Sequence, residues 1–202
     1  MQKAIAILMD EHRRIEQVLG SLEAFAASLG QGLSEERSLL GCYAGFFRDF
    51  ADAFHHAKEE DVLFERLVES GFSRESGPVA VMLHEHQLGR AHVSSLRRLA
   101  GKGGPLSAVE RQQAQQAAGA FVPLLRAHIL KEDRILYPMA LRVLSGPELD
   151  EMAEAFAALE RARQEDGSWD RFQALAEQLL AVIPPDPALM AAAAEAGGCW
   201  AR

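Results

Sequence analysis

The sequence predicts an all-α protein, an up-down-up-down four-helix bundle followed by a C-terminal helical extension. Alanine and leucine are abundant, whereas valine, isoleucine and threonine are scarce, and this composition favours helices over strands. Glycine and proline divide the chain into long stretches with helical periodicity. The links between these stretches are short, so we expect consecutive helices to pack antiparallel.

Four long helices are expected, over about residues 2–29, 34–70, 78–100 and 106–144. Glycine or proline marks each break between them: Gly30 and Gly32, Gly71, Gly77-Pro78, Gly101 to Pro105, and Gly146-Pro147. Ser107 and Glu110 form a capping box at the start of the fourth helix. Pro123 and Pro138 lie inside that helix, where we expect kinks rather than a break.

The chain is expected to have two parts, the bundle over residues 1–144 and an extension over residues 145–202. The extension shows two shorter helical patterns, about 147–164 and 168–183, followed by three prolines and an alanine-rich end. It contains no histidine, so we assign it to packing or to a partner surface and not to chemistry.

Composition and charge exclude several functions. The net charge is -8 with histidine neutral, and such a surface repels phosphate backbones, so no nucleic-acid partner is expected. The apolar run at residues 4–9 is too short for a signal peptide or a membrane span. Cys42 and Cys199 fit no paired motif, which indicates a cytoplasmic protein without a disulfide framework.

Polar residues occupy positions that belong to the core. The seam of the first helix advances in steps of three and four residues: Ile5, Leu8, His12, Ile15 and Leu19. In the fourth helix, His128 and Glu132 fill two successive seam positions. An imidazole and a carboxylate on one core face are unfavourable unless something binds them. A metal ion would bind both, and a hydrogen bond within the helix is the alternative.

The same arrangement occurs twice. Residues 55–64 and 128–137 share the pattern H-x-x-K-E-[ED]-x-[VI]-L-[FY], so His55 corresponds to His128 and Glu59 to Glu132. The first and third helices each carry a Glu-His pair, ending at His12 and His86. The chain therefore reads as two helical hairpins of one plan, each with a lone histidine and a His-x3-Glu pair.

The resulting set has four imidazoles and two carboxylates: His12, His55, Glu59, His86, His128 and Glu132. It suits two metal ions, with a carboxylate from each hairpin as a bridge and two imidazoles for each ion. Mixed nitrogen and oxygen ligands favour iron, manganese or zinc over calcium or magnesium.

The second helix leaves an ambiguity. Its apolar residues lie nearer the face of His56 and Glu60 than that of His55 and Glu59. The match with the fourth helix favours His55 and Glu59, provided that the extension covers the phenylalanine-rich face. His56 can then be a fifth ligand, a hydrogen-bond partner of a ligand, or a solvated residue.

Neighbouring polar residues are given structural roles. Glu11 and Glu85 precede predicted ligands and either orient an imidazole or are solvated, and solvation is favoured. Arg90 is expected in an ion pair at the rim of the site, with a position near an anionic ligand as the alternative. Tyr43 and Tyr137 are expected to take part in ordinary packing, with a hydrogen bond to a bound oxygen species as the alternative.

Together these motifs resemble the hemerythrin-like, or HHE cation-binding, domain over about residues 8–140. The resemblance implies a left-handed four-helix bundle with two iron ions, bridged by two carboxylates and an oxo or hydroxo group. It transfers the metal roles to the six residues above. Such domains carry or sense dioxygen, respond to nitric oxide, store or sense iron, or repair iron–sulfur clusters.

Two departures from the family pattern narrow the expected function. Met82 and Arg90 stand where oxygen-carrying hemerythrins have a further histidine one turn from the third-helix ligand, so a fifth imidazole is expected to be missing. We therefore expect redox or sensing chemistry rather than reversible oxygen carriage. The cysteine-containing N-terminal segment of cluster-repair members is also missing, which lowers the expectation of repair.

Three functions follow as hypotheses. The first is a di-iron protein that binds or senses dioxygen, nitric oxide, peroxide or iron. The alternative is a di-iron oxidoreductase that turns over peroxide or nitric oxide. The third is a metal-independent interaction bundle. The expected partner is a small diatomic or peroxide ligand, without nucleic acid or membrane, and a homodimer is compatible with all three.

Overall fold

A computed structural model describes residues 2–188 as six helical rods, in which η denotes a π-helical segment. The first and third rods are α1 (Lys3–Ser28) and α4 (Gly77–Ala100). The second rod joins α2 (Glu36–Phe46), η1 (Phe47–His56), η2 (Glu59–Leu63) and α3 (Phe64–Glu69). The fourth joins α5 (Ala108–Lys131), η3 (Glu132–Leu136) and α6 (Tyr137–Val143). The last two are α7 (Gly146–Glu165) and α8 (Ser168–Val182).

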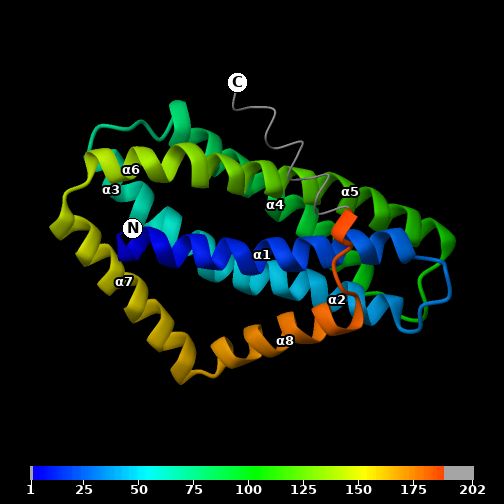
Figure 1. The fold of residues 1–202 in the computed structure, drawn as a ribbon. Coiled ribbons are helices and arrows are strands. Elements are labelled where there is room, and N and C mark those ends of the chain that lie inside the picture. Colours follow the sequence, from blue (N-terminus) through cyan, green and yellow to red (C-terminus); the bar gives the residue numbers. More distant parts are fainter. Residues whose placement is uncertain (1, 189–202) are drawn as a thin grey trace.

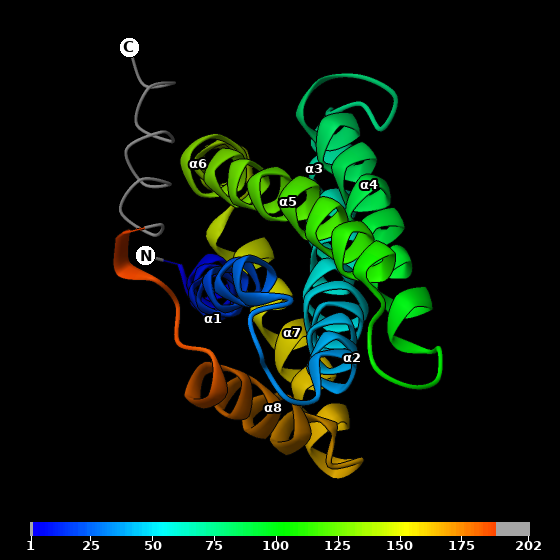
Figure 2. The same cartoon turned by 90° about the vertical axis from the view of Figure 1, so that its right-hand side faces the viewer.

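The first four rods form the expected up-down-up-down bundle (Figure 1). α1 packs against α5 and η1, while α4 packs against α2 and α5, so the rods close a ring around one interior. α7 and α8 lie together on the side of α1 and α2, as the turned view shows (Figure 2). The predicted all-α class and bundle architecture are confirmed.

The fourth rod continues through both prolines. Pro123 lies inside α5, and Pro138 follows η3 in the first turn of α6. The capping box at Ser107 and Glu110 is formed, and Ser145 and Glu148 form a second one at the start of α7. The chain therefore turns sharply into α7 and does not extend the fourth rod.

The extension covers the phenylalanine-rich face of the second rod. The Phe54 ring lies 5.5 Å from that of Trp169, and the Phe50 ring lies 5.9 Å from that of Phe172. At the far end of α8, the Ser21 hydroxyl donates to the Ile183 carbonyl at 2.6 Å. Part of the apolar periodicity of the second rod therefore reflects packing against the extension and not against the other bundle rods.

The interior contains two apolar clusters with a polar layer between them. One cluster runs from Ile15 toward the α2 end, and the other surrounds Leu8, Leu63 and Leu136. Buried histidines and glutamates occupy the middle of the four bundle rods.

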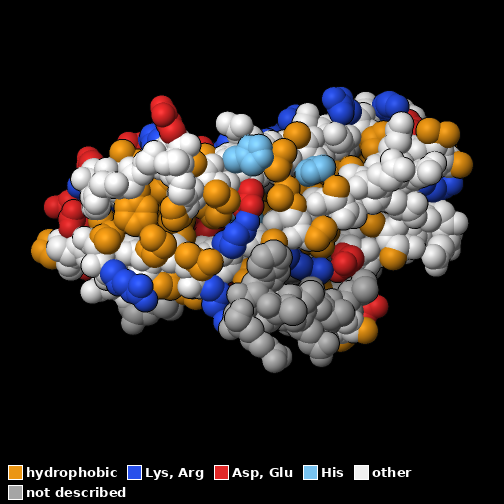
Figure 3. Space-filling model, turned by 90° about the horizontal axis from the view of Figure 1, so that it is seen from above, with side chains coloured by type: hydrophobic (Ala, Val, Ile, Leu, Met, Phe, Trp, Pro, Cys, Tyr) orange, Lys and Arg blue, Asp and Glu red, His pale blue; other side chains and the backbone are white. Residues whose placement is uncertain are grey.

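On the face of the molecule that Figure 3 shows, charged and hydrophobic side chains are interspersed. Cys42 is half-buried, and burial raises the pKa of its thiol, whereas Cys199 lies outside the described residues.

Within residues 2–188, every helix is too short or too polar to cross a bilayer.

Candidate metal centre

All six predicted ligands meet in the polar layer. His12, His55, Glu59 and Glu132 form one group, in which the candidate ligand atoms lie within 4.8 Å of one another. Glu59 also belongs to a second group that contains His86 and His128. All six side chains are buried, and they come from α1, the second rod, α4 and the fourth rod.

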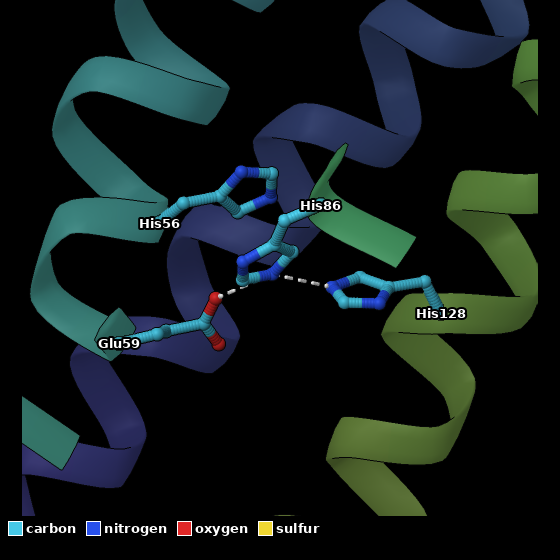
Figure 4. A group of neighbouring side chains, drawn as sticks. All are labelled: His56, Glu59, His86 and His128. Atoms are coloured by element: carbon cyan, nitrogen blue, oxygen red, sulfur yellow. Dashed lines mark hydrogen bonds and ion pairs between the residues drawn. The ribbon is translucent and has the colours of Figure 1, made fainter. Parts of the chain in front are cut away.

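A seventh side chain, His56, joins the second group (Figure 4). Its ring is stacked on the His86 ring, with centroids 3.7 Å apart and planes 13° apart. The cluster thus contains a fifth imidazole, and of the roles left open for His56 a solvated position is excluded because the residue is buried. The additional ring comes from the residue beside His55 and not from the third helix.

The π-helical geometry of the second rod explains how two consecutive histidines reach the same interior. On a regular α-helix, neighbouring side chains point about 100° apart, so one core face rarely takes both. η1 ends at His56, and both His55 and His56 are buried. η2 and η3 begin at Glu59 and Glu132, the matching glutamates of the repeated motif. Single wide turns of this kind are frequent at functional sites.

Every histidine of the cluster is held from behind by a carboxylate on its Nδ1. The pairs are His12 with Asp133 at 2.8 Å, His55 with Glu11 at 2.8 Å, His56 with Asp52 at 3.3 Å, His86 with Glu60 at 2.6 Å, and His128 with Glu85 at 3.0 Å. An ionised carboxylate only accepts, so each Nδ1 donates, and a ring in its neutral form is left with a lone pair on Nε2 for a metal ion. Metal-binding histidines show this same arrangement.

This pattern decides between the two expected roles of Glu11 and Glu85. The favoured role, a solvated side chain, is wrong, because Glu11 is buried and Glu85 is largely covered. Each orients the imidazole of the opposite rod in its own hairpin. The recurrence of a glutamate before both lone histidines was the signal for this role.

Several buried polar atoms in the cluster lack a hydrogen-bond partner. They are Glu59 Oε2 and both oxygens of Glu132. The Nε2 atoms of His86 and His128 lie 3.0 Å apart, so without a cation they share a proton in a hydrogen bond. Cations would satisfy all of these atoms. Separations between 3.1 and 3.7 Å from histidine Nε2 to glutamate oxygens suit donors that share an ion at about 2.0–2.2 Å.

Without cations, the histidines titrate very differently from one another. Burial opposes the charging of His12, but its hydrogen bond to Asp133 and the charge of Glu132 prevail and raise its pKa to about 9. Burial likewise opposes the charging of His128, yet the charge of Glu132 and the hydrogen bond to Glu85 raise its pKa to about 10. Burial and the nearby His86 lower the pKa of His56 to about 3. Two of these rings therefore hold protons where cations would sit.

Tyr137 has a polar role instead of the expected ordinary packing. Its hydroxyl donates to Glu59 Oε1 at 2.6 Å, and its ring stacks on His12 at 5.5 Å. Burial and the charges of Glu59 and Glu132 hold the pKa of the phenol well above its usual value. Arg90 forms the expected rim ion pairs, at 2.7 Å with both Asp52 and Glu60.

Lys58 is the residue that sequence reasoning missed. It is fully buried, and its ammonium donates to Glu11 and, at 2.8 Å, to Glu160 of α7. Its counterpart in the repeated motif, Lys131, donates to Glu85. The lysine shared by both copies of the motif could have indicated this pairing, but nothing local could have indicated Glu160.

Comparison with known proteins agrees with this geometry. Residues 3–140 match the family model described as the hemerythrin HHE cation binding domain. An uncharacterized protein of Mycobacterium tuberculosis is 24% identical over 163 residues, which cover 77% of this chain and 60% of that protein. The iron–sulfur cluster repair protein YtfE of Musicola paradisiaca is 34% identical over 91 residues, which cover 44% of this chain and 40% of that protein.

The chain thus spans about three-fifths of the length of the mycobacterial protein that it matches. No solved structure matches. The family match covers all seven residues of the buried cluster and all four rods of the bundle, up to Ala140 in α6. On this evidence, the chain belongs to the hemerythrin HHE cation-binding domain family.

Proposed function

We propose that this protein holds two iron ions in its polar layer and uses them to bind a small ligand such as dioxygen, nitric oxide or peroxide. The observation that carries the proposal is the convergence of four histidine Nε2 atoms, of His12, His55, His86 and His128, on buried carboxylate oxygens that have no hydrogen-bond partner. Such an interior is unfavourable as a purely structural core, because its polar groups remain unsatisfied.

The two groups divide the ligands between the ions. His56, His86 and His128 would hold one ion, and His12, His55 and Glu132 would hold the other. Glu59 belongs to both groups, which makes it the natural bridge. Mixed nitrogen and oxygen donors suit iron, and manganese or zinc would also be accepted by this set. When bound, the iron pair supplies a redox-active site for the small ligand.

The protein prepares this site through its own side chains. Five carboxylates fix the five rings, and Tyr137 holds one oxygen of Glu59, so the donor atoms need little rearrangement. The apolar clusters on both sides exclude water from the layer. This organisation favours a permanent cofactor site over transient cation uptake.

A pocket of about 240 Å³ supports access by a small ligand. It reaches His56 from outside, and Arg48, Arg90 and Arg97 line it together with Asp52. Arg48 pairs with Asp49, and Arg90 pairs with Asp52 and Glu60, so most of the positive charge of the lining is compensated locally. Phe47 and Phe121 form part of its apolar wall. A small ligand without a large net charge fits this environment.

Metal content and an optical spectrum test the proposal together. Aerobically purified protein should contain about two iron ions per chain and show near-ultraviolet charge-transfer bands. Reduction followed by nitric oxide or dioxygen should give a stable adduct, whereas steady-state turnover of peroxide or nitric oxide would favour the oxidoreductase alternative. Protein without stoichiometric metal, even after anaerobic addition of iron, would contradict the proposal.

A further inference from the structure

The centre has a buried connection to the C-terminal extension through Lys58. Its ammonium is completely shielded from solvent and lies 4.1 Å from the centre of the Phe54 ring. A buried ammonium requires compensating charge, and here two carboxylates, of Glu11 and Glu160, provide it. Glu160 belongs to α7, beyond the residues that the family model matches.

The connection continues to a proposed ligand. Glu11 binds Lys58 with one carboxylate oxygen and the Nδ1 of His55, at 2.8 Å, with the other. An unbroken series of charged contacts therefore runs from Glu160 through Lys58 and Glu11 to His55. Its outer end, Glu160, is 27% exposed, while the two inner members are buried.

The other half of the cluster provides an internal comparison. Lys131, Glu85 and His128 repeat the same contacts in the second hairpin. Lys131 is 34% exposed, and among the described residues Glu85 alone pairs with it. α7 packs on α1 and η2, so it covers only the half that contains Lys58 (Figures 1 and 2).

The charges in this series determine how strongly Glu11 accepts from His55. A positive charge on Lys58 draws electron density from Glu11 and weakens its hydrogen bond to the imidazole. Glu160 partly offsets that positive charge. When the Nδ1–H of an imidazole donates a stronger hydrogen bond to a carboxylate, the imidazole becomes a more electron-rich ligand. Such a ligand favours the oxidised metal.

We propose that Lys58 and Glu160 are positioning residues through which α7 adjusts the electron-donating strength of His55. The inference rests on the proposed metal centre. Through these residues the extension influences the metal centre, because the position of α7 sets how close the negative charge of Glu160 lies to Lys58. By reciprocity, a change in charge at the His55 half alters how firmly Glu160 is held.

Midpoint potentials of the iron-loaded full chain test the proposal. Glu160→Gln should raise the potential of one of the two iron ions, because Lys58 then acts on Glu11 without an offset. Lys58→Met should lower that potential, and Glu160→Gln should have no further effect in the Lys58→Met background. Unchanged potentials in both single variants at full iron content would overturn the proposal.

Two controls separate this role from simple packing. Glu151→Gln removes an exposed α7 ion pair, 2.9 Å from Arg66, and should leave both potentials unchanged. Lys131→Met should change the midpoint potential of the other iron ion. The effect of Glu160→Gln should be the same with and without the Lys131→Met substitution. Equal shifts from Glu151→Gln and Glu160→Gln would show a general effect of α7 and overturn the proposal.

A second measurement does not depend on iron. In zinc-loaded protein, nuclear magnetic resonance of the histidine side chains should show a shift of His55 Nδ1–H in Glu160→Gln and little change at His128. Wild-type protein that binds no iron would contradict the proposed function. Full metal with an unmoved His55 signal would contradict only the present inference.

Discussion

His55 and His56 are adjacent in the chain, yet they belong to different halves of the buried cluster. His55 groups with His12 and Glu132, whereas His56 groups with His86 and His128. The π-helical turns of the second rod bring both rings inward. The two groups therefore separate at the peptide bond between His55 and His56, and under the proposed function the removal of His56 should affect only one of the two ions.

Replacing His56 with alanine should lower the metal content from about two ions per chain to about one. The ion near His86 and His128 would lose one of its three imidazoles, while the other group stays complete. Elemental analysis of the purified variant measures this loss. His84→Ala is the control, because that side chain is exposed on α4. Two ions retained with an unchanged spectrum would show that His56 is not a ligand.

Replacing His128 with alanine should remove metal and metal-dependent stability together. Ligand binding to the folded state alone stabilises it by about 4 kcal/mol when the free ligand is at a thousand times its Kd. Much of the difference in unfolding free energy between loaded and metal-free protein should therefore disappear in the variant. Chemical denaturation with and without chelator measures it. A variant that keeps the full difference would contradict the assignment of His128.

Replacing Tyr137 with phenylalanine should destabilise the metal-free protein by about 1–3 kcal/mol, because a buried carboxylate oxygen of Glu59 loses its donor. Urea unfolding measures the change. Tyr43→Phe is the matched control, since its hydroxyl bonds to Ser21 at 2.6 Å and belongs to a different part of the core. Metal should reduce the loss in the Tyr137 variant and leave that of the control unchanged.

The stability of the metal-free protein should pass through a maximum near pH 6.5. The pKa values of His12 and His128 rise from 6.5 to about 9 and about 10 on folding, so their contribution is complete below pH 6.5 and is lost as the pH rises through those values. His56 has a folded pKa of about 3, so its contribution is present above pH 6.5 and is lost on acidification.

Denaturation of chelator-treated protein at a series of pH values tests this maximum. The alkaline loss should be smaller in metal-loaded protein, because cations then replace the protons on the two rings. Metal-free stability that rises between pH 7 and 9 would contradict the predicted direction.

The sequence was sufficient for the bundle and for six members of the cluster. Seam positions depend only on helical periodicity. The repeated motif identified His55 and Glu59, although the apolar residues of the same helix lie nearer the face of His56 and Glu60. His56 could not be placed, because a periodicity of about 3.6 residues does not describe a π-helical turn. The face of the second rod also depends on Trp169 and Phe172, which are more than a hundred residues away.

Residues that act across rods were harder to predict than residues that face the interior. Glu11 and Tyr137 act through contacts with other rods, and these depend on the distance and rotation between helices. Glu160 is the extreme case, because its role depends on how α7 turns back after Gly146. Local patterns carry no information about such a turn beyond the break itself.

The polar layer lies at mid-length, with independently packed hydrocarbon at each end of the bundle. The crossing angles of the rods are consequently least constrained by apolar packing at the point where the cations would bind. A rod that is packed at both ends cannot tilt as a whole without disturbing one of them. Any change of geometry in the polar layer would therefore be absorbed by bending at mid-length, where the wide turns at Glu59 and Glu132 begin.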